Sequence, residues 1–391
     1  MPKRLVYLDN AATTPVRPEV LEAMLPYLGR DAFGNPSSAH RFGRTARAGV
    51  EEAKRAIAET LGAEPGQVIF TSGGTEADNL AVIGGALAAR DRGGPFRVAV
   101  SAIEHKAVLA AAHAVVHLGG EEIILPVDGS GAVSVDAVDE ALERGVAVVC
   151  VMWVNNEVGV VQAVGPLGGR CHEAGVPFHV DAVQAFGKIP VSLCDVPCTL
   201  LTLSGHKIGA PKGIGALIVR DRHVVEAIIH GGGQQFGIRP GTENVPGIVA
   251  LGKAVELAAR EQAEFAARVA ALRDELERRL LTLVPDAVIN AARGPRAPHV
   301  CNVSIPGTDS EALLMHLDLA GIACSSGSAC STGAVEPSHV LTAMGVPREL
   351  GVAALRFSFG KDNTMEDVDT VMGAVPKVVE RVRALSAVLH R

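Results

Sequence analysis

Short apolar runs alternate with helical patterns over the first part of the chain. The runs cover residues 68–71, 98–100, 123–125, 146–154, 178–180, 199–203 and 216–219. Short runs rich in Val, Ile and Leu are typical of strands that are buried on both faces of a sheet. Because helical segments separate the runs, the pattern predicts an α/β fold with a mainly parallel seven-stranded sheet covered by helices on both faces.

Several of the connecting helices carry start signals or clear periodicity. Pro18 stands at the first position of a helix that is predicted to end at Leu28. Residues 45–61 have amphipathic spacing, and residues 75–89 are rich in Ala. Ser134 is predicted to be the N-cap of a helix over residues 135–143, since its hydroxyl can accept a hydrogen bond from the first turn.

The composition changes after Pro246. Residues 248–283 contain no Pro and keep 3.6-residue apolar spacing, which predicts one unusually long helix. The elements predicted beyond it are a strand over 300–305, a helix over 310–320, a strand over 354–359 and a last helix from Met365. We therefore expect a large domain over residues 16–255 and a smaller α+β domain formed by residues 1–15 and 256–391.

Composition and charge exclude several classes of protein. The 391 residues carry a net charge of -7, and 3% of them are aromatic. Binding to nucleic acid is disfavoured, because it needs clustered basic side chains and aromatic stacking platforms. No run reaches the roughly 18 apolar residues of a membrane span, and no apolar signal segment follows the first residues. We expect a cytoplasmic protein that does not bind membranes.

The seven cysteines are an odd number, which argues against a disulfide framework. Cys194 and Cys198 are loosely spaced like metal ligands, but no second pair of ligands accompanies them. No metal site is predicted.

The tetrapeptide Ser204-Gly205-His206-Lys207 follows the apolar run 199–203 at an expected strand end. Chemistry in α/β proteins gathers at such ends. Partial desolvation there lowers the pKa of a lysine and frees its amine to form a Schiff base, for which pyridoxal phosphate is the leading candidate. The alternative is a lysine that caps a carbonyl of a loop.

Residues 71–76 join a predicted strand to a helix through Gly73 and Gly74. The free N–H groups of the helix start, the Thr75 hydroxyl and the helix dipole together suit a phosphate. An ordinary helix N-cap explains the pattern equally well. The chain has no GxxxxGK[ST] motif, so a nucleotide P-loop is not supported.

Polar residues also end three other predicted strands. Asp181 could pair with a protonated pyridine nitrogen, and Gln184 could bond the hydroxyl of the same ring. His105 opens a helix, where an imidazole could lie over the ring and move protons. Caps, surface positions and ion pairs are the alternatives for these residues. Residues 155–157 end the longest apolar run, and their side chains need hydrogen-bond partners if buried.

Residues 324–333 are rich in Gly, Ser and Cys and contain little that could pack a core. Such composition is typical of a mobile loop that carries function. Cys330 lies in this segment. A thiolate there could attack a sulfur atom and carry it away, and the alternative is an unreactive thiol in a linker.

A set of motifs occurs in order between about residues 6 and 361. The motifs are Leu8–Thr14, Gly34–Ser38, Gly74-Thr75, Glu104-His105, Asn155–Glu157, Asp181–Gln184, Ser204–Lys207, Arg239–Asn244, Ser325–Cys330 and Arg356–Ser358. Taken together, they resemble the cysteine desulfurases that supply iron–sulfur cluster assembly.

The resemblance implies a dimeric fold-type I pyridoxal phosphate transferase, whose large domain binds the cofactor and whose small domain carries the Cys330 loop. The implied cofactor-binding residues are Gly74, Thr75, His105, Asn156, Asp181, Gln184, Ser204, His206, Lys207 and Thr242 of the partner subunit. Within this set, Lys207 would form the Schiff base, and Gly74, Thr75, Ser204, His206 and Thr242 of the partner subunit would hold the phosphate. Asn156 and Arg356 would bind the carboxylate of the substrate.

The resemblance also implies a reaction in which L-cysteine becomes L-alanine. Lys207 would move the Cα proton, and Cys330, assisted by His105, would take the sulfur as a persulfide. An acceptor protein for iron–sulfur assembly or tRNA thiolation would then receive it.

Three other functions are alternatives to that of a cysteine desulfurase. An aminotransferase or selenocysteine lyase of the same fold would keep Lys207 and Asp181, but transamination needs no thiol such as Cys330. An adaptor without activity would be expected to lose such residues. A metal-binding sulfur carrier would use Cys194, Cys198 and the cysteines of the loop.

Overall fold

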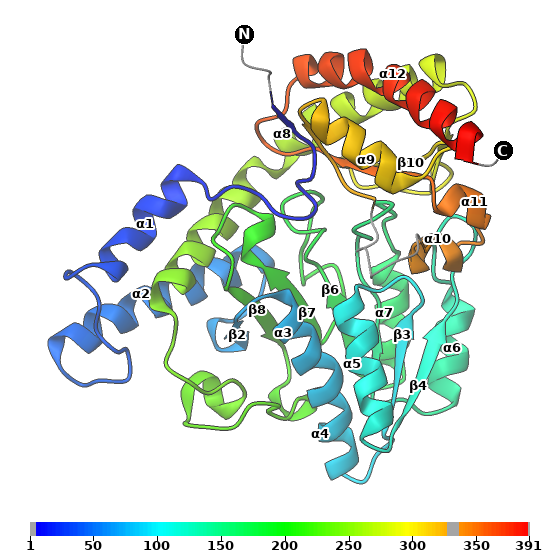
Figure 1. The fold of residues 1–391 in the computed structure, drawn as a ribbon. Helices are drawn as coiled ribbons and strands as arrows, with labels where there is room; N and C mark the ends of the chain where they lie inside the picture. Colours follow the sequence, from blue (N-terminus) through cyan, green and yellow to red (C-terminus); the bar gives the residue numbers. More distant parts are fainter. Residues whose placement is uncertain (1–4, 327–335, 390–391) are drawn as a thin grey trace.

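The structure is a computed structural model that describes residues 5–326 and 336–389 (Figure 1). Its largest sheet has seven strands in the order β2-β8-β7-β6-β5-β3-β4. The strands are β2 (Val68–Thr71), β3 (Arg97–Ser101), β4 (Glu121–Leu125), β5 (Val148–Cys150), β6 (Phe178–Asp181), β7 (Leu200–Ser204) and β8 (Gly215–Val219). All pairs are parallel except the two that involve β8. The predicted mainly parallel seven-stranded sheet is confirmed.

One of the predicted strands is too long. The apolar run 146–154 forms a strand only over β5, since the N–H of Met152 donates to the Glu104 carboxylate at 2.6 Å instead of to a neighbouring strand. Val154 then forms an antiparallel bridge with Val161. The chain therefore turns back after β5 and places residues 155–160 in a buried loop at the edge of the sheet.

Helices cover both faces of this sheet. One face packs against α2 (Arg41–Leu61), α6 (Val135–Glu143), α7 (Val164–Glu173) and the first half of α8 (Val245–Leu283). The other face packs against α5 (Lys106–His117) and a continuous helix over residues 74–91. That helix contains α3 (Gly74–Asn79), a π-turn (Leu80–Gly84) and α4 (Gly85–Asp91).

The start signals in the sequence predicted some of the helix starts correctly and missed others. Ser134 caps α6 as predicted, and α1 (Pro18–Leu28) begins at its proline. α2 begins four residues earlier than predicted, because the His40 ring accepts the N–H of Gly43 at 3.2 Å and caps the helix. The π-turn inside the helix over residues 74–91 was not predicted.

A second hydrophobic core lies beyond the large sheet. The last part of α8 packs there against α9 (Ser310–Leu319), α12 (Met365–Leu389) and a three-stranded antiparallel sheet in the order β12-β10-β9. Its strands are β9 (Val288–Ile289), β10 (Val300–Ser304) and β12 (Ala354–Ser358), and the short helices α10 (His339–Ala343) and α11 (Arg348–Gly351) complete this region. The 39-residue α8 thus runs from one core to the other (Figure 1). The division of the chain at residues 15 and 255 stays a prediction.

The first residues of the described chain join the second core. β1 (Val6–Tyr7) pairs in parallel with β11 (Ile322–Ala323), and Asp9 bridges to Ser358. Residues 10–14 then cross to the large sheet, where the N–H of Thr14 donates to the carbonyl of His206 at 3.0 Å. No helix among the described residues is long and apolar enough to cross a membrane.

Candidate active site

The carboxyl ends of β2, β3, β6 and β7 lie along one edge of the large sheet. This edge brings together the loops that follow Thr71, Ser101, Asp181 and Ser204. Ligands of open α/β sheets bind at this edge. Most of the residues that the sequence singled out lie on these loops.

Lys207 ends a short 3-10 turn directly after β7. Its amine donates to the carbonyls of Ala11 and Ala12 at 2.7 Å each, so the lysine does cap loop carbonyls. Burial, together with the charge of Arg356, lowers the pKa of Lys207 to about 8, while the charges of Asp181 and Asp9 act in the opposite direction. A substantial fraction of the amine is therefore neutral near physiological pH, as Schiff-base formation requires.

Asp181 is buried at the end of β6. Its carboxylate accepts the N–H of Val183 at 2.8 Å, and among the described residues no cation lies within ion-pair distance of it. Burial raises the pKa of Asp181, while the Val183 N–H, His105 and Lys207 act in the opposite direction. A cationic ring nitrogen placed against this carboxyl group would keep it ionised.

His105 is the N-cap of α5, as the alternative interpretation of the sequence held. Its Nδ1 accepts the N–H of Ala107 at 3.1 Å, which leaves Nε2 for another partner. Burial lowers the pKa of His105, and the charges of Asp181 and Lys207 then act on it with opposite signs. The imidazole therefore belongs to the same cluster as Lys207 and Asp181, and its predominant form at neutral pH is uncharged.

The loop before α3 has the geometry that an anion needs. Gly73 has φ = +155°, which only glycine adopts readily, and a Cβ on Gly74 would come within 3.1 Å of Val183 Cγ2 and 3.4 Å of Ser204 Cβ. The loop thus lies close to the ends of β6 and β7. The first N–H groups of a helix have no partners within it, so those of α3 are available to a phosphate.

Two further residues assigned to the cofactor are already engaged with the N-terminal segment. Gln184 donates to the Ala11 carbonyl at 2.8 Å, and its Oε1 lies 3.3 Å from His299 Nε2. The His206 ring lies 3.1 Å from the Thr13 hydroxyl, and burial with the charge of Lys207 lowers its pKa to about 4. Thr242 is exposed in the segment before α8, and its assignment stays a prediction.

Arg356 and Asn156, the two residues assigned to the substrate carboxylate, lie together. The buried guanidinium of Arg356 donates to the Asn156 carbonyl at 2.9 Å and to Asp9 at 2.7 Å. Its Nε is buried without a hydrogen-bond partner among the described residues. A carboxylate would satisfy this donor.

The polar residues after β5 have the partners that burial requires. Asn155 donates to the Ile103 carbonyl and accepts the N–H groups of Glu157 and Val158. Ser338 donates to the Glu157 carboxylate, and burial raises the pKa of that carboxyl group. The loop 155–157 is therefore fixed to the smaller core as well as to the sheet.

Sequence reasoning missed two buried acids beside Asp181. Glu104 accepts hydrogen bonds from Ser101 at 2.5 Å and Met152 at 2.6 Å, and burial raises its pKa to about 8. Asp78 lies on α3, and burial together with the charge of Asp181 raises its pKa well above the usual range. The sequence offered one signal, which was that each acid lies close to the start of a predicted helix. Acids at helix starts are common on exposed surfaces too, so this signal does not identify a buried acid.

Cys330 lies outside the described residues. The segments on either side of residues 327–335 do contact the site. Ser325 and Arg356 exchange two backbone hydrogen bonds of 3.1 and 2.6 Å, and the His339 ring lies 3.0 Å from the Glu104 carbonyl.

The cluster offers three groups at one sheet edge: a partly buried amine of lowered pKa, a buried carboxyl group that has no cation beside it among the described residues, and the free end of a helix. A ligand with an aldehyde, a basic ring nitrogen and a phosphate would satisfy all three. Pyridoxal phosphate has these groups, so the residues present fit this cofactor.

Comparison with known proteins agrees with this chemistry. The sequence matches the family described as Aminotransferase class-V over residues 6–371. A protein named Cysteine desulfurase IscS from Dictyoglomus turgidum (strain DSM 6724 / Z-1310) is 43% identical over 384 residues, which are 98% of this chain and 97% of that protein. A protein of the same name from Methanosarcina thermophila is 44% identical over 383 residues, 98% of this chain and 94% of that protein.

Solved structures resemble the whole chain. A structure titled "NIFS-LIKE PROTEIN" has a TM-score of 0.89 at 35% identity and covers 97% of this chain and 100% of its own. A structure titled "SspA in complex with cysteine" has a TM-score of 0.79 at 35% identity and covers 90% of this chain and 98% of its own.

Proposed function

Because this chain belongs to the class-V aminotransferase family and is a cysteine desulfurase that uses pyridoxal phosphate, we propose that its cofactor is bound through Lys207, Asp181 and His105. Lys207 would hold the cofactor through its aldehyde, Asp181 would keep a proton on the ring nitrogen, and His105 would contact the ring. Gln184 bonds the ring hydroxyl, and Asn156 also contacts the cofactor. Gly74, Thr75, Ser204, His206 and Thr242 of the partner subunit hold the phosphate. When bound, pyridoxal phosphate supplies an aldehyde for amines and a ring that accepts electrons from the substrate Cα.

The chain's own residues bind and orient L-cysteine. Arg356 and Asn156 bind the substrate carboxylate, which requires Arg356 to share its donors between that group and Asp9. The unpartnered Nε of Arg356 supports this role. Lys207 then takes the Cα proton, because its amine is partly neutral at physiological pH.

Cys330 is the sulfur acceptor in this proposal. Its thiolate forms a bond with the substrate sulfur, and the electrons of the broken carbon–sulfur bond pass to the substrate side. Protonation of Cβ and return of a proton from Lys207 to Cα complete L-alanine, and the sulfur remains on Cys330 as a persulfide. His105 accepts and returns protons during this exchange.

Sulfur then leaves for an acceptor protein. The IscS name of the relatives supports an acceptor in iron–sulfur cluster assembly. A protein of a tRNA-thiolation relay is the alternative acceptor, because it would take sulfur from the same persulfide. We further propose that the enzyme is a homodimer and that it works in the cytoplasm.

The observation that carries the assignment is the juxtaposition of the Lys207 amine with the His105 ring and the buried Asp181. It is tested by loading the protein with pyridoxal phosphate and measuring alanine and sulfide from L-cysteine. We expect both products from the wild type, and loss of the cofactor absorbance above 400 nm in Lys207→Ala.

Cys330→Ala separates the two halves of the reaction. It is expected to change the cofactor spectrum on addition of L-cysteine but to release no alanine. Alanine at the wild-type rate from this variant would show that Cys330 is not the acceptor, while leaving Lys207 in place.

A further inference from the structure

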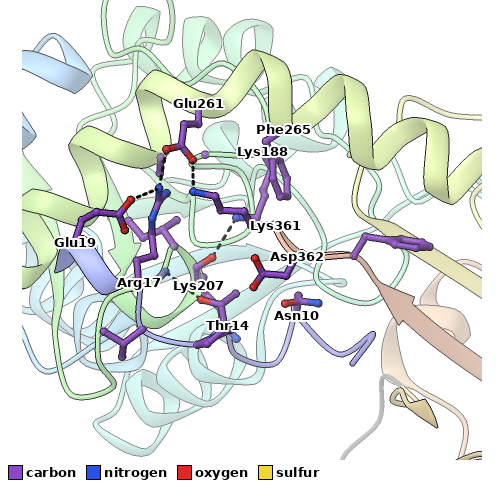
Figure 2. A pocket seen from close by; sticks show the side chains of 18 of the residues that line it. Asn10, Thr14, Arg17, Glu19, Lys188, Lys207, Glu261, Phe265, Lys361 and Asp362 are labelled. Carbon is purple, nitrogen blue, oxygen red and sulfur yellow. Dashed lines mark hydrogen bonds and ion pairs between the residues drawn. The ribbon is translucent and has the colours of Figure 1, made fainter. Parts of the chain in front are cut away.

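A cavity lies beside the main chain of Lys207 (Figure 2). Its volume is about 480 Å³, within the range of small-molecule sites. The N-terminal segment 10–19, the turn at Gly187 and Lys188, residues 207–209, α8 and the loop 359–362 form its wall. Of the described residues that we assign to the cofactor, only Lys207 lines this cavity.

Lys188 supplies a buried cation to the wall. The residue is 8% exposed, and its amine donates to the Lys207 carbonyl at 3.1 Å and lies 5.1 Å from the centre of the Phe265 ring. Among the described residues, no carboxylate lies within ion-pair distance of it. An ammonium group has three donors, so this contact leaves donors for a ligand.

The other charged side chains of the wall, apart from Lys207, are the cations Arg17 and Lys361 and the acids Glu19, Glu261 and Asp362, so they leave no excess positive charge. Glu261 pairs with Arg17 at 2.7 Å and with Lys361 at 3.0 Å, and its pKa is lowered to about 2 chiefly by the hydrogen bond from Arg17. Figure 2 shows this ion-pair cluster at one side of the cavity and Lys188 next to Phe265. The amine of Lys207 is directed to the Ala11 and Ala12 carbonyls and is assigned to the cofactor. Lys188 is therefore the buried cation of the wall that has no carboxylate partner among the described residues and can bind an anion.

The rest of the wall is mainly apolar. It includes Val16, Ile208, Ala258, Phe265 and Phe359. An occupant with a charged end and a short apolar body would bury carbon against these side chains and give Lys188 an acceptor.

We propose that this cavity binds a small organic carboxylate, whose carboxylate group contacts Lys188 and whose apolar body lies against Phe265 and Ile208. The site is separate from the proposed function, because substrate carboxylate binding there uses Arg356 and Asn156. A ligand in this cavity would contact the Lys188 amine, which donates to the main-chain carbonyl of Lys207.

The test uses the cofactor-loaded enzyme and 4-fluorophenylacetate, followed by ¹⁹F NMR. The uncharged isostere 4-fluorophenylacetamide is the matched control ligand. We expect saturable binding of the acid and at least about tenfold weaker binding of the amide, as loss of a charge-assisted hydrogen bond predicts. Lys188→Met should weaken binding of the acid by a similar factor, whereas Lys253→Gln, on α8 but outside the cavity wall, should leave it within about twofold.

Circular dichroism and thermal unfolding establish whether each variant folds. If Lys188→Met does not fold, Ala258→Leu decides, since the larger side chain occupies part of the cavity from α8 and leaves the Lys188 side chain in the protein. Loss of binding in this variant supports the site. Absence of saturation in the wild type would mean that the cavity holds only water, and equal binding of the amide would exclude a carboxylate site. Displacement by L-alanine, together with unchanged binding in Lys188→Met, would place the probe at the cofactor site and overturn the proposal.

Discussion

Burial sets the chemistry of single side chains in this site. Lys207 has a pKa of about 8 in place of 10.5, with burial as the largest cause. A lowered pKa means that the amine loses its proton at lower pH. We predict that the cofactor-free enzyme binds pyridoxal phosphate faster as pH rises and that this rate levels off above about pH 8.

Stopped-flow absorbance of the Schiff base measures this rate directly. A rate that keeps rising about tenfold per pH unit between pH 8.5 and 10 would show an ordinary lysine and contradict the prediction.

Glu104 shows the opposite effect. Burial raises its pKa to about 8, so the folded protein holds a proton that the unfolded chain releases above about pH 4.5. Ionisation of Glu104 in the unfolded chain therefore lowers the stability of the folded protein increasingly as pH rises from about 4.5 to 8, and this loss then stays constant. We predict that Glu104→Gln, which resembles the protonated acid, gains stability relative to the wild type over this range.

Thermal unfolding at pH 5 and pH 8 tests the Glu104 prediction. The difference in Tm between variant and wild type should be larger at pH 8, by at least about 2 °C. Ser101→Ala is a useful companion, because it removes a hydrogen bond to the carboxylate at 2.5 Å without changing the acid. An equal Tm difference at both pH values would show that Glu104 is ionised in the folded protein.

α8 is the element that connects the two hydrophobic cores. Its first half packs on the large sheet and its last part on the smaller core, and the exposed Glu264 lies between these regions. A proline there removes a helix hydrogen bond and clashes with the preceding turn. We predict that Glu264→Pro lowers the free energy of unfolding by about 3 kcal/mol or more, whereas Glu264→Ala changes it little.

Chemical denaturation followed by circular dichroism checks this prediction. A proline variant as stable as the alanine variant would mean that the helix already tolerates a kink at this position.

The elements were more predictable than their contacts. Strands such as β7 and β8 are buried throughout and mainly apolar because both faces are covered, so their sequences reveal them. Ser134 and Pro18 mark helix starts by local chemistry. The early start of α2 escaped prediction because histidine is an uncommon cap. The bonds from Lys207 to the Ala11 and Ala12 carbonyls join residues almost two hundred positions apart, and no local pattern encodes such a pairing.

The same distinction applies to the site. Asp181, His105 and Lys207 were found because strand ends gather chemistry, and the structure brings them together. Glu104 and Asp78 were missed, since their burial depends on packing between β5, α3 and the end of β3. Cys330 was assigned from the sequence, lies outside the described residues and stays a prediction.

The whole molecule leaves an apolar stripe uncovered. Leu21, Leu25 and Leu28 on α1 are 47%, 52% and 61% exposed, and their spacing places them on one side of the helix. Such a stripe is costly in water unless another chain covers it. Because we propose a homodimer, we predict that Leu25→Asp weakens dimerisation at least about tenfold, while Glu22→Gln on the same helix does not.

Sedimentation equilibrium over a range of concentrations measures this effect. An unchanged association constant in Leu25→Asp would place the dimer interface elsewhere on the molecule.

The crossing of the N-terminal segment has a consequence for biosynthesis. Residues 6–14 contact residues 206–207, 321–323 and 358, so their partners leave the ribosome long after they do. A nascent chain cannot close these contacts until almost all of it has been synthesised, and such distant pairing slows folding. Truncated translation products therefore lack the strand that carries Arg356, and an incomplete chain should release no sulfur from cysteine.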